Sequence, residues 1–372
     1  MKDHQIMVFV GNGFDISVLQ KYGKGITTKY ASFYSFFKYR YPDSSNLLIT
    51  YMEEAKSKNR EDWSDFEVIL AEELRSSSES DQEKVEKLKT DLSKIQQTFS
   101  SFLNDIIDSD IISKISKAND VIMGYNENCA KKNLKCSFLK DLSKSQYEAL
   151  HFHNNFSNHD SIKYIFINFN YTYLFDNYLY LDKQVFDPEP YMTSNNNIHL
   201  SLNPNGYQHT GFIDPYVKMM PIDIFHPHGI QDVPKSLLFG IENGNYCKQR
   251  DPRREFVKSL WAQCEDKYAD KFKNTELFII YGCSIGESDS WWWSRIYERL
   301  IGEDSAELII YNYGNENEDV IKEKFIKNCC LKDSNMEEKN KAKENIYVID
   351  FGIDVEVNQE FMSLPDINIE TP

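Results

Sequence analysis

The sequence predicts an α/β fold in which a Rossmann-like parallel sheet is flanked by helices. Short apolar runs recur far apart along the chain, and each is hydrophobic throughout rather than at alternate positions. Such continuity is typical of strands buried on both faces, as in a parallel sheet covered by helices. The first run leads directly into a glycine turn, and the long segment before the second run is mostly helical in pattern. The predicted strands occupy residues 6–10, 164–169, 277–281, 308–312 and 347–351.

Length and composition favour one large folded domain. We expect a single domain over residues 1–372 that carries a helical insertion over residues 60–160. Hydrophobic residues make up 41% of the chain, and 23 tyrosines and 24 phenylalanines indicate a packed globule rather than a disordered chain. The formal net charge of −16 would repel a nucleic acid, so we expect no nucleic-acid partner.

The sequence also indicates in which cellular compartment the protein is expected. The N-terminal segment enters a strand without an export signal, and no window is apolar enough over the length of a membrane span. The seven cysteines are odd in number and lack paired CxxC units, which fits reduced thiols better than a disulfide framework or a zinc site. We therefore expect a cytoplasmic protein with no metal and no membrane partner. A local cluster of basic residues, surrounded by acids, consists of Lys248, Arg250, Arg253 and Arg254. We interpret it as a solvated helix start rather than a phosphate clamp.

A glycine turn follows the first predicted strand, in the order Gly11, Asn12, Gly13, Phe14 and Asp15. Since glycine tolerates positive φ and has no Cβ, a helix that begins near Gly13 can present its free N–H groups to a pyrophosphate, which favours a dinucleotide ligand. The third glycine of the usual fingerprint is missing, and a tight structural turn is an equal alternative. Asp15 would either stabilise a ribose or a cationic transition state, or cap the helix.

The long segment before the second strand contains a regular apolar stripe. Apolar residues follow steps of three and four between residues 85 and 106, which predicts a helix with one buried face. We favour packing of this helix on its own domain over a subunit interface. Residues 186–220, rich in Asn, Pro, Tyr and Gly, are predicted to form an irregular loop, and residues 315–345 a surface helix and loop before the last strand.

Polar residues follow the second strand at its carboxyl end, where ligands bind in open α/β sheets. Asn170 offers both an amide N–H₂ and a carbonyl to a ribose hydroxyl or a water, although an Asx turn that ends the strand is the structural alternative. His228, followed by Gly229, could act as a general base. An H-x-H metal site with His226 fits poorly, because alternate strand residues point in opposite directions and carboxylate partners are missing.

The third predicted strand leaves through a second candidate phosphate or ribose loop that contains Gly282, Ser284 and Asp289. Three consecutive tryptophans follow, at residues 291–293. Since they cannot share one helix face, one or two should pack inward and another could cover a ligand or a partner.

Taken together, these blocks resemble the AbiH-type bacteriophage abortive-infection proteins over roughly residues 6 to 312. Five blocks in the same order are more specific than any one of them. The blocks are Gly11–Asp15 with Thr28–Phe33, Trp63–Glu67, Phe169–Thr172, His228–Gly229, and Tyr281–Ile285 with Asp289.

That family in turn is similar to the sirtuin-like NAD-binding fold. The resemblance implies that Gly11 and Gly13 hold the phosphates, that Asn170 and His228 lie at the nicotinamide ribose as catalytic groups, and that Ser284 lies at the adenosine ribose. Thr172 stands where a sirtuin carries Asp, and the chain lacks the four-cysteine zinc module. Both departures count against protein deacylation and leave simple NAD⁺ cleavage less affected.

The expectation that follows is an anti-phage NAD⁺ glycohydrolase that releases nicotinamide and depletes NAD, which is its substrate. A non-catalytic nucleotide-binding sensor or scaffold that signals through its helical insertion is the alternative. A phage-derived trigger and a homo-oligomer are the further partners considered. The predicted catalytic residues are Asn170 and His228, and the predicted binding residues are Gly11, Asn12, Gly13, Phe14, Asp15, Thr172, Gly229, Gly282, Ser284 and Asp289.

Overall fold

The computed structural model describes residues 1–77, 81–115, 136–179, 197–207, 214–242, 244–248, 250–302, 304, 306–314, 316–329, 334–352 and 359–367. An eight-stranded sheet runs through it in the order β3-β4-β2-β1-β6-β7-β8, and β5 pairs with β2 beside β4. Every pairing is parallel except that of β3 with β4. The strands are β1 (Asp3–Val10), β2 (Ser161–Asn168), β3 (Asn197–His199), β4 (Tyr216–Met219), β5 (Asp223–Phe225), β6 (Thr275–Tyr281), β7 (Glu307–Tyr313) and β8 (Ile346–Phe351). The Rossmann-like α/β class is thereby confirmed.

All five predicted strands are present as β1, β2, β6, β7 and β8, and most begin a few residues earlier than predicted. The irregular loop predicted over residues 186–220 is wrong in part, because β3 and β4 lie within it. These strands are short and carry no long apolar run, so the sequence pattern does not reveal them. Residues 180–196 and 208–213 of that segment lie outside the described residues. The domain limits, including the insertion over 60–160, stay a prediction.

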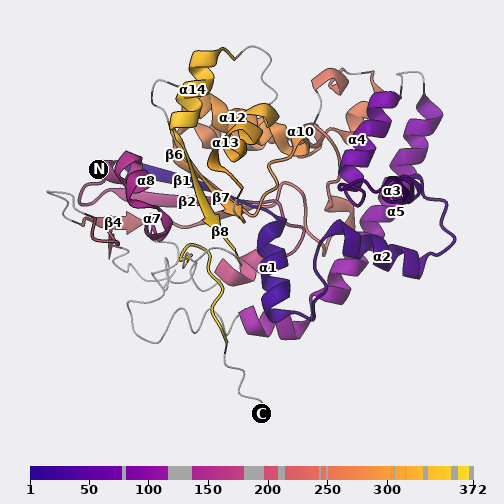
Figure 1. Ribbon diagram of the computed structural model, residues 1–372, viewed down its shortest axis with the longest axis horizontal. Helices are drawn as coiled ribbons and strands as arrows, with labels where there is room; N and C mark the ends of the chain where they lie inside the picture. Colours follow the sequence, from indigo (N-terminus) through magenta and orange to yellow (C-terminus); the bar gives the residue numbers. More distant parts are fainter. Residues whose placement is uncertain are drawn as a thin grey trace.

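Helices cover both faces of the sheet and also form a separate group (Figure 1). The α-helices are α1 (Asn12–Tyr22), α2 (Tyr30–Arg40), α3 (Leu47–Ser57), α4 (Phe66–Ser76), α5 (Gln82–Ile106), α7 (Phe138–Asp141), α8 (Lys144–Ala149), α10 (Lys258–Trp261), α11 (Cys264–Lys273), α12 (Ser290–Ile301), α13 (Glu318–Asn328) and α14 (Met336–Glu344). Short 3₁₀ helices are η1 (Phe152–Asn155), η2 (Pro234–Ser236), η3 (Gly244–Tyr246), η4 (Pro252–Phe256) and η5 (Glu287–Asp289). Within the described ranges, no helix has both the length and the apolar character that crossing a membrane requires.

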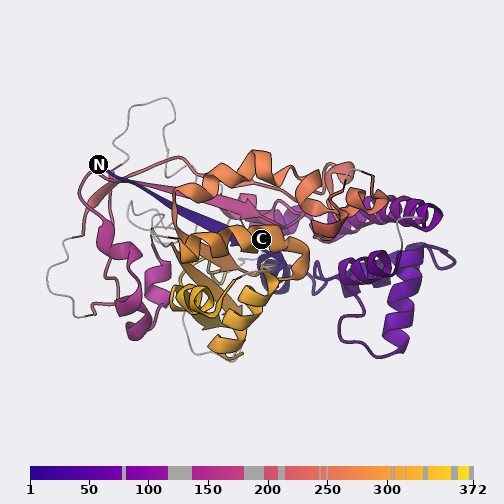
Figure 2. The same cartoon turned by 90° about the horizontal axis from the view of Figure 1, so that it is seen from above.

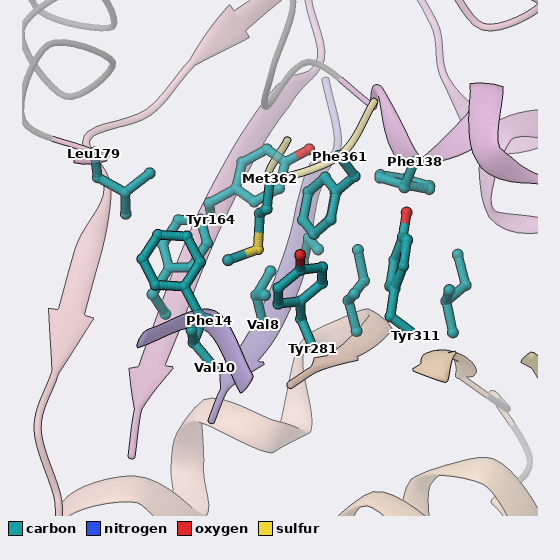
Figure 3. Packing of buried hydrophobic residues seen from close by; sticks show 14 of the residues in the cluster. Val8, Val10, Phe14, Phe138, Tyr164, Leu179, Tyr281, Tyr311, Phe361 and Met362 are labelled. Atoms are coloured by element: carbon teal, nitrogen blue, oxygen red, sulfur yellow. The ribbon is translucent and has the colours of Figure 1, made fainter. Parts of the chain in front are cut away.

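The central strand β1 is buried on both faces, as its continuous hydrophobicity predicts. Val8 and Val10 belong to one core cluster, together with Phe14 of α1 (Figure 3). Met7 and Phe9, which point to the other face, belong to a second cluster with residues of α11, α12 and α13. Alternate side chains of β1 therefore pack into two separate core clusters, one on each face of the sheet.

A third core cluster belongs to helices α2–α5, which Figures 1 and 2 show grouped at the end of the molecule away from the N-terminus. The predicted apolar stripe of α5 is confirmed, since its side chains pack into this cluster within the same chain. Six members of the stripe are at most 8% exposed, and the seventh, Ile106, is partly buried against the same cluster: Val85, Leu88, Leu92, Ile95, Phe99 and Phe102 are the six. Packing on its own chain, rather than on a second subunit, thus accounts for the burial of this face.

The parallel register brings the carboxyl ends of the central strands to one edge. Val10 at the end of β1 pairs with Asn168 of β2 on one side and with Tyr281 of β6 on the other. The turns that follow these three strands consequently meet beside one another. The edge is also adjacent to residues of the α2–α5 group, and the two together enclose the site described next.

Candidate functional site

A cavity of about 850 Å³ lies at the carboxyl edge of the sheet. Its walls come from the turns after β1, β2 and β6, from the end of β7, and from helices α1, α2, α4, α5, α10, α12 and α13. The predicted site residues that line it are Gly11, Asn12, Gly13, Asp15, Asn170, Thr172, His228, Gly282, Ser284 and Asp289. Segments scattered along the chain thus converge on one space.

Two predicted binding residues do not line this cavity. Phe14 points away from it into the core, where its ring packs against Phe175 and Tyr178 at centroid distances of 5.2 and 5.3 Å (Figure 3). Gly229 has φ +83°, and a Cβ there would lie 2.0 Å from the Ser236 carbonyl oxygen. Both positions are explained by packing, since Phe14 fills the core and Gly229 allows a tight turn.

The glycine turn is a contact between two backbone loops. The Gly11 N–H donates to the Tyr281 carbonyl at 2.9 Å, and the Gly13 N–H donates to the Gly282 carbonyl at 2.8 Å. A Cβ at Gly13 would lie 2.7 Å from the Gly282 Cα, so the loops could not approach with larger residues. These two N–H groups are therefore occupied by carbonyls, and the structural-turn alternative accounts for the two glycines. A phosphate site at Gly11 and Gly13, formed by the other N–H groups at the start of α1, stays a prediction.

Asp15 lies in the first turn of α1 and is 1% exposed. Its Oδ2 accepts a hydrogen bond from the Thr172 hydroxyl at 2.7 Å, whereas its Oδ1 is buried without a partner. Burial of the carboxyl raises its pKa to about 7. The helix-capping alternative is wrong, because the N-cap is Gly11 and no side chain caps the helix. Asp15 is left as an incompletely bonded acid on the cavity wall.

Asn170 is 2% exposed, and neither its Oδ1 nor its Nδ2 has a hydrogen-bond partner. The Asx turn that ends the strand is formed instead by Asn168, whose Oδ1 accepts from the Asn170 backbone N–H at 3.0 Å. Asn168 thus performs the structural role that we considered for Asn170. A buried amide with every polar atom free is costly unless a ligand or water completes it.

His228 is 4% exposed, and its ring stacks on Phe169 at a centroid distance of 4.6 Å. Its Nε2 lies 3.1 Å from Oδ1 of Asp289. His226, two residues earlier, instead has its Nε2 3.0 Å from Oδ1 of Asp176. The two imidazoles therefore contact different carboxylates. In the described part of the chain, no three His, Cys, Asp or Glu side chains are grouped to hold a metal ion.

A buried ion-pair network lies beside His228, and its cation was missed by sequence reasoning. Lys258 is 4% exposed, and its Nζ lies 2.8 Å from Oε1 of Glu67 and 3.4 Å from Oδ1 of Asp289. Burial alone would raise the pKa of Asp289, but the charges of Lys258 and His228 outweigh it and hold that pKa well below its usual range. Glu67 falls within one of the recognised sequence blocks, whereas no motif surrounds Lys258.

The loop after β6 contributes Ser284 and leads into the tryptophans. Trp292 and Trp293 are 3% and 1% exposed, and Trp293 also lines the cavity and donates its Nε1–H to the Gly286 carbonyl at 2.9 Å. Trp291 packs beside the same core and lies under the Arg295 guanidinium. Inward packing of two tryptophans is thus confirmed, and one of the two does reach the cavity.

The basic cluster is not a uniformly solvated helix start, so that prediction is wrong for Arg253. Its guanidinium pairs with Asp251 at 2.8 Å and donates to the Ser77 carbonyl at 2.7 Å. It also lies 4.2 Å from the Tyr246 ring. Arg253 therefore joins η4 to the end of α4, which the sequence could not indicate because Ser77 is distant along the chain.

Comparisons with known proteins support the sequence resemblance at the family level. No curated protein and no solved structure gives a significant match to the chain. The family model described as "Bacteriophage abortive infection AbiH" matches residues 7–313, which contain the sheet edge and the cavity residues named above. The chain therefore belongs to the AbiH family of bacteriophage abortive-infection proteins.

Proposed function

We propose that this protein is an NAD⁺ glycohydrolase that releases nicotinamide during phage infection and so depletes the cofactor. The observation that carries the proposal is the Asn170 side chain, which is buried in the cavity wall with its amide oxygen and nitrogen both unbonded. His228, a residue type suited to proton transfer, lines the same cavity. The family description associates the chain with phage defence, and the residue types in the cavity support the proposed chemistry.

The reaction breaks the bond between the nicotinamide nitrogen and the ribose anomeric carbon. The electron pair of that bond goes to the pyridinium ring, which leaves as neutral nicotinamide. A water oxygen then bonds to the anomeric carbon, and one proton must be removed from it. Asn170 would orient this water, because an amide both donates and accepts hydrogen bonds. His228 would accept the proton, and a positioned base of this kind contributes roughly 10²- to 10⁴-fold to a rate.

Asp289 lies beside His228 and supports this role. Its carboxylate is 3.1 Å from Nε2 without hydrogen-bond geometry, so its contribution is one of charge, which favours a proton on that nitrogen and would leave Nδ1 as the basic atom. Lys258 in turn compensates the Asp289 charge. Stacking on Phe169 restricts rotation of the imidazole ring. The imidazole of the proposed base is therefore held by the Asp289 charge at its Nε2 side and by the Phe169 ring against one face.

The test is release of nicotinamide from NAD⁺ by the purified protein, with and without extract from phage-infected cells as the source of a trigger. Asn170→Ala and His228→Ala should each lower the rate at least about 100-fold. His151→Ala is the matched control, because the His151 side chain is 80% exposed and lies away from the cavity, and it should retain the full rate.

Two results would count against the proposal. Nicotinamide release that survives both substitutions would show that other residues perform the chemistry. Binding of NAD⁺ without any release, even with the infected-cell extract, would favour the non-catalytic nucleotide sensor instead. Circular dichroism of each variant establishes that a loss of activity is not a loss of folding.

A further inference from the structure

Asp15 and Asn170 present a set of unfilled hydrogen-bonding positions in one cavity. Asp15 leaves one buried carboxylate oxygen without a donor, and Asn170 leaves one buried carbonyl oxygen and one amide nitrogen without partners. Both residues line the cavity and are at most 2% exposed. Water or a ligand must complete these groups, because a buried polar atom without a partner is costly.

A cis-diol matches this set. One O–H group can donate to Oδ1 of Asp15, and the other hydroxyl can accept from one N–H of the Asn170 amide, which leaves the Asn170 carbonyl oxygen and the second N–H for the attacking water. We propose that Asp15 and Asn170 together bind the vicinal hydroxyls of a ribose, so that the cavity selects a ribonucleotide over its deoxy counterpart. The proposal rests on the proposed function, because it places the ribose beside the scissile bond of NAD⁺ at these two residues.

Thr172 positions Asp15 for this contact. Its hydroxyl donates to Oδ2 of Asp15 at 2.7 Å, which fixes the carboxyl plane and leaves Oδ1 for the ligand. Thr172 follows Asn170 by two residues in the turn after β2, so one short segment holds one residue of the pair and orients the other. Thr172 thereby acts as a positioning residue.

The charges around Asp15 give the contact a pH dependence. The pKa of Asp15 is raised to about 7 in all: burial raises it most, the Thr172 hydrogen bond lowers it, the charge of Asp176 raises it and the charge of His226 lowers it. Other titratable groups also line the cavity: Lys29, Asp65, Glu67, Arg75, His228, Glu242, Lys258, Glu287, Asp289, Glu316 and Lys324. Asp15 accepts a strong hydrogen bond only when it is ionised, so affinity for the diol should fall as the pH drops below about 7.

Calorimetry with ADP-ribose tests the proposal, using as second probe the analogue that lacks the 2-hydroxyl of the terminal ribose. ADP-ribose carries no nicotinamide, so contacts with the carboxamide cannot contribute. At pH 8, the wild type should bind ADP-ribose about tenfold more tightly than the deoxy analogue. Asp15→Asn should bind both equally. Its affinity should also stay constant between pH 6 and 8, where that of the wild type changes.

Two further variants separate the contact from structural effects. Asp65→Asn is the matched control, since Asp65 is another cavity carboxyl with its pKa raised to about 6 by burial, but its oxygen already accepts two backbone N–H groups. It should keep the preference for the ribose hydroxyl. Thr172→Val removes the bond that lowers the Asp15 pKa, so the midpoint of the pH dependence should move upward.

Equal binding of the two probes by the wild type, or an unchanged preference in Asp15→Asn, would overturn the inference. If Asp15→Asn weakens NAD⁺ but not ADP-ribose, the residue contacts the nicotinamide and the inference also fails. Selective binding of ADP-ribose without nicotinamide release would leave the inference standing and defeat the proposed function. Nicotinamide release that is unchanged by Asp15→Asn and by removal of the 2-hydroxyl would leave the proposed function standing and defeat the inference.

Discussion

Replacing Lys258 with Met should destabilise the protein strongly, because the lysine is the cation between two carboxylates. Lys258 is 4% exposed and lies 2.8 Å from Glu67 and 3.4 Å from Asp289. Removing one partner of a buried ion pair costs about 3–5 kcal/mol, since a charge is left without compensation. We expect the lower end of this range, because the Tyr30 hydroxyl and the Gly240 N–H still donate to Glu67.

The loss should depend on pH with a defined sign. The folded-state pKa of Asp289 lies below its unfolded value, so this carboxylate stabilises the wild type above about pH 4, and the contribution is lost as the pH falls through the folded-state pKa. Without Lys258, the buried negative charge of Asp289 destabilises the folded variant. Protonation of Asp289 at low pH removes that charge and so reduces the loss of stability. The difference in unfolding free energy between wild type and variant should therefore be largest at pH 7 and narrow toward pH 4.

Urea unfolding followed by tryptophan fluorescence measures this difference at each pH. Lys144→Met is the matched control, because its ion pair with Glu148 lies on a helix surface with both side chains largely exposed. The control should keep the wild-type urea midpoint. A Lys258→Met midpoint equal to that of the control at pH 7, or a difference that widens as the pH falls, would refute the reasoning.

The remaining predictions concern packing near the cavity. Gly13→Ala places a Cβ 2.7 Å from the Gly282 Cα and should lower the unfolding free energy by more than about 1 kcal/mol, whereas Gly286→Ala, whose nearest contact is 3.6 Å, should be tolerated. Equal urea midpoints for the two variants would contradict the close approach of the loops. Trp293→Ala empties a site 1% exposed and should cost about 3–5 kcal/mol by the same assay. Trp261→Ala, at a site that is 59% exposed, should lower the unfolding free energy far less than Trp293→Ala. Similar losses in the two variants would contradict the difference in burial.

Much of the fold follows from local sequence pattern. Continuous apolar runs predicted β1, β2, β6, β7 and β8, and the three- and four-residue steps predicted α5. The short strands β3–β5 escaped prediction because a strand of three or four residues gives too few positions for a periodic signal. The pairing of β4 and β5 with β2, and of β3 with β4, is a consequence of tertiary structure.

The candidate site was predictable where polar residues follow strands, and not where the partners come from distant segments. Asn170, His228 and Asp289 could be named because each stands after an apolar run or beside a glycine. Lys258 could not, since its importance depends on two carboxylates far away along the chain. The hydrogen bonds of the Gly11 and Gly13 N–H groups could not be predicted for the same reason. Their acceptors are the carbonyls of Tyr281, at the end of β6, and of Gly282, just after it, which no local motif reveals.

The central claim is that Asn170 and His228 cleave NAD⁺ in the cavity at the sheet edge. Its most direct test is quantitation of free nicotinamide from NAD⁺ and purified protein, in the presence of extract from phage-infected cells. We predict release by the wild type and by His151→Ala, and loss of release in both Asn170→Ala and His228→Ala with folding retained. Undiminished release by these two variants, or none by the folded wild type, would contradict the account.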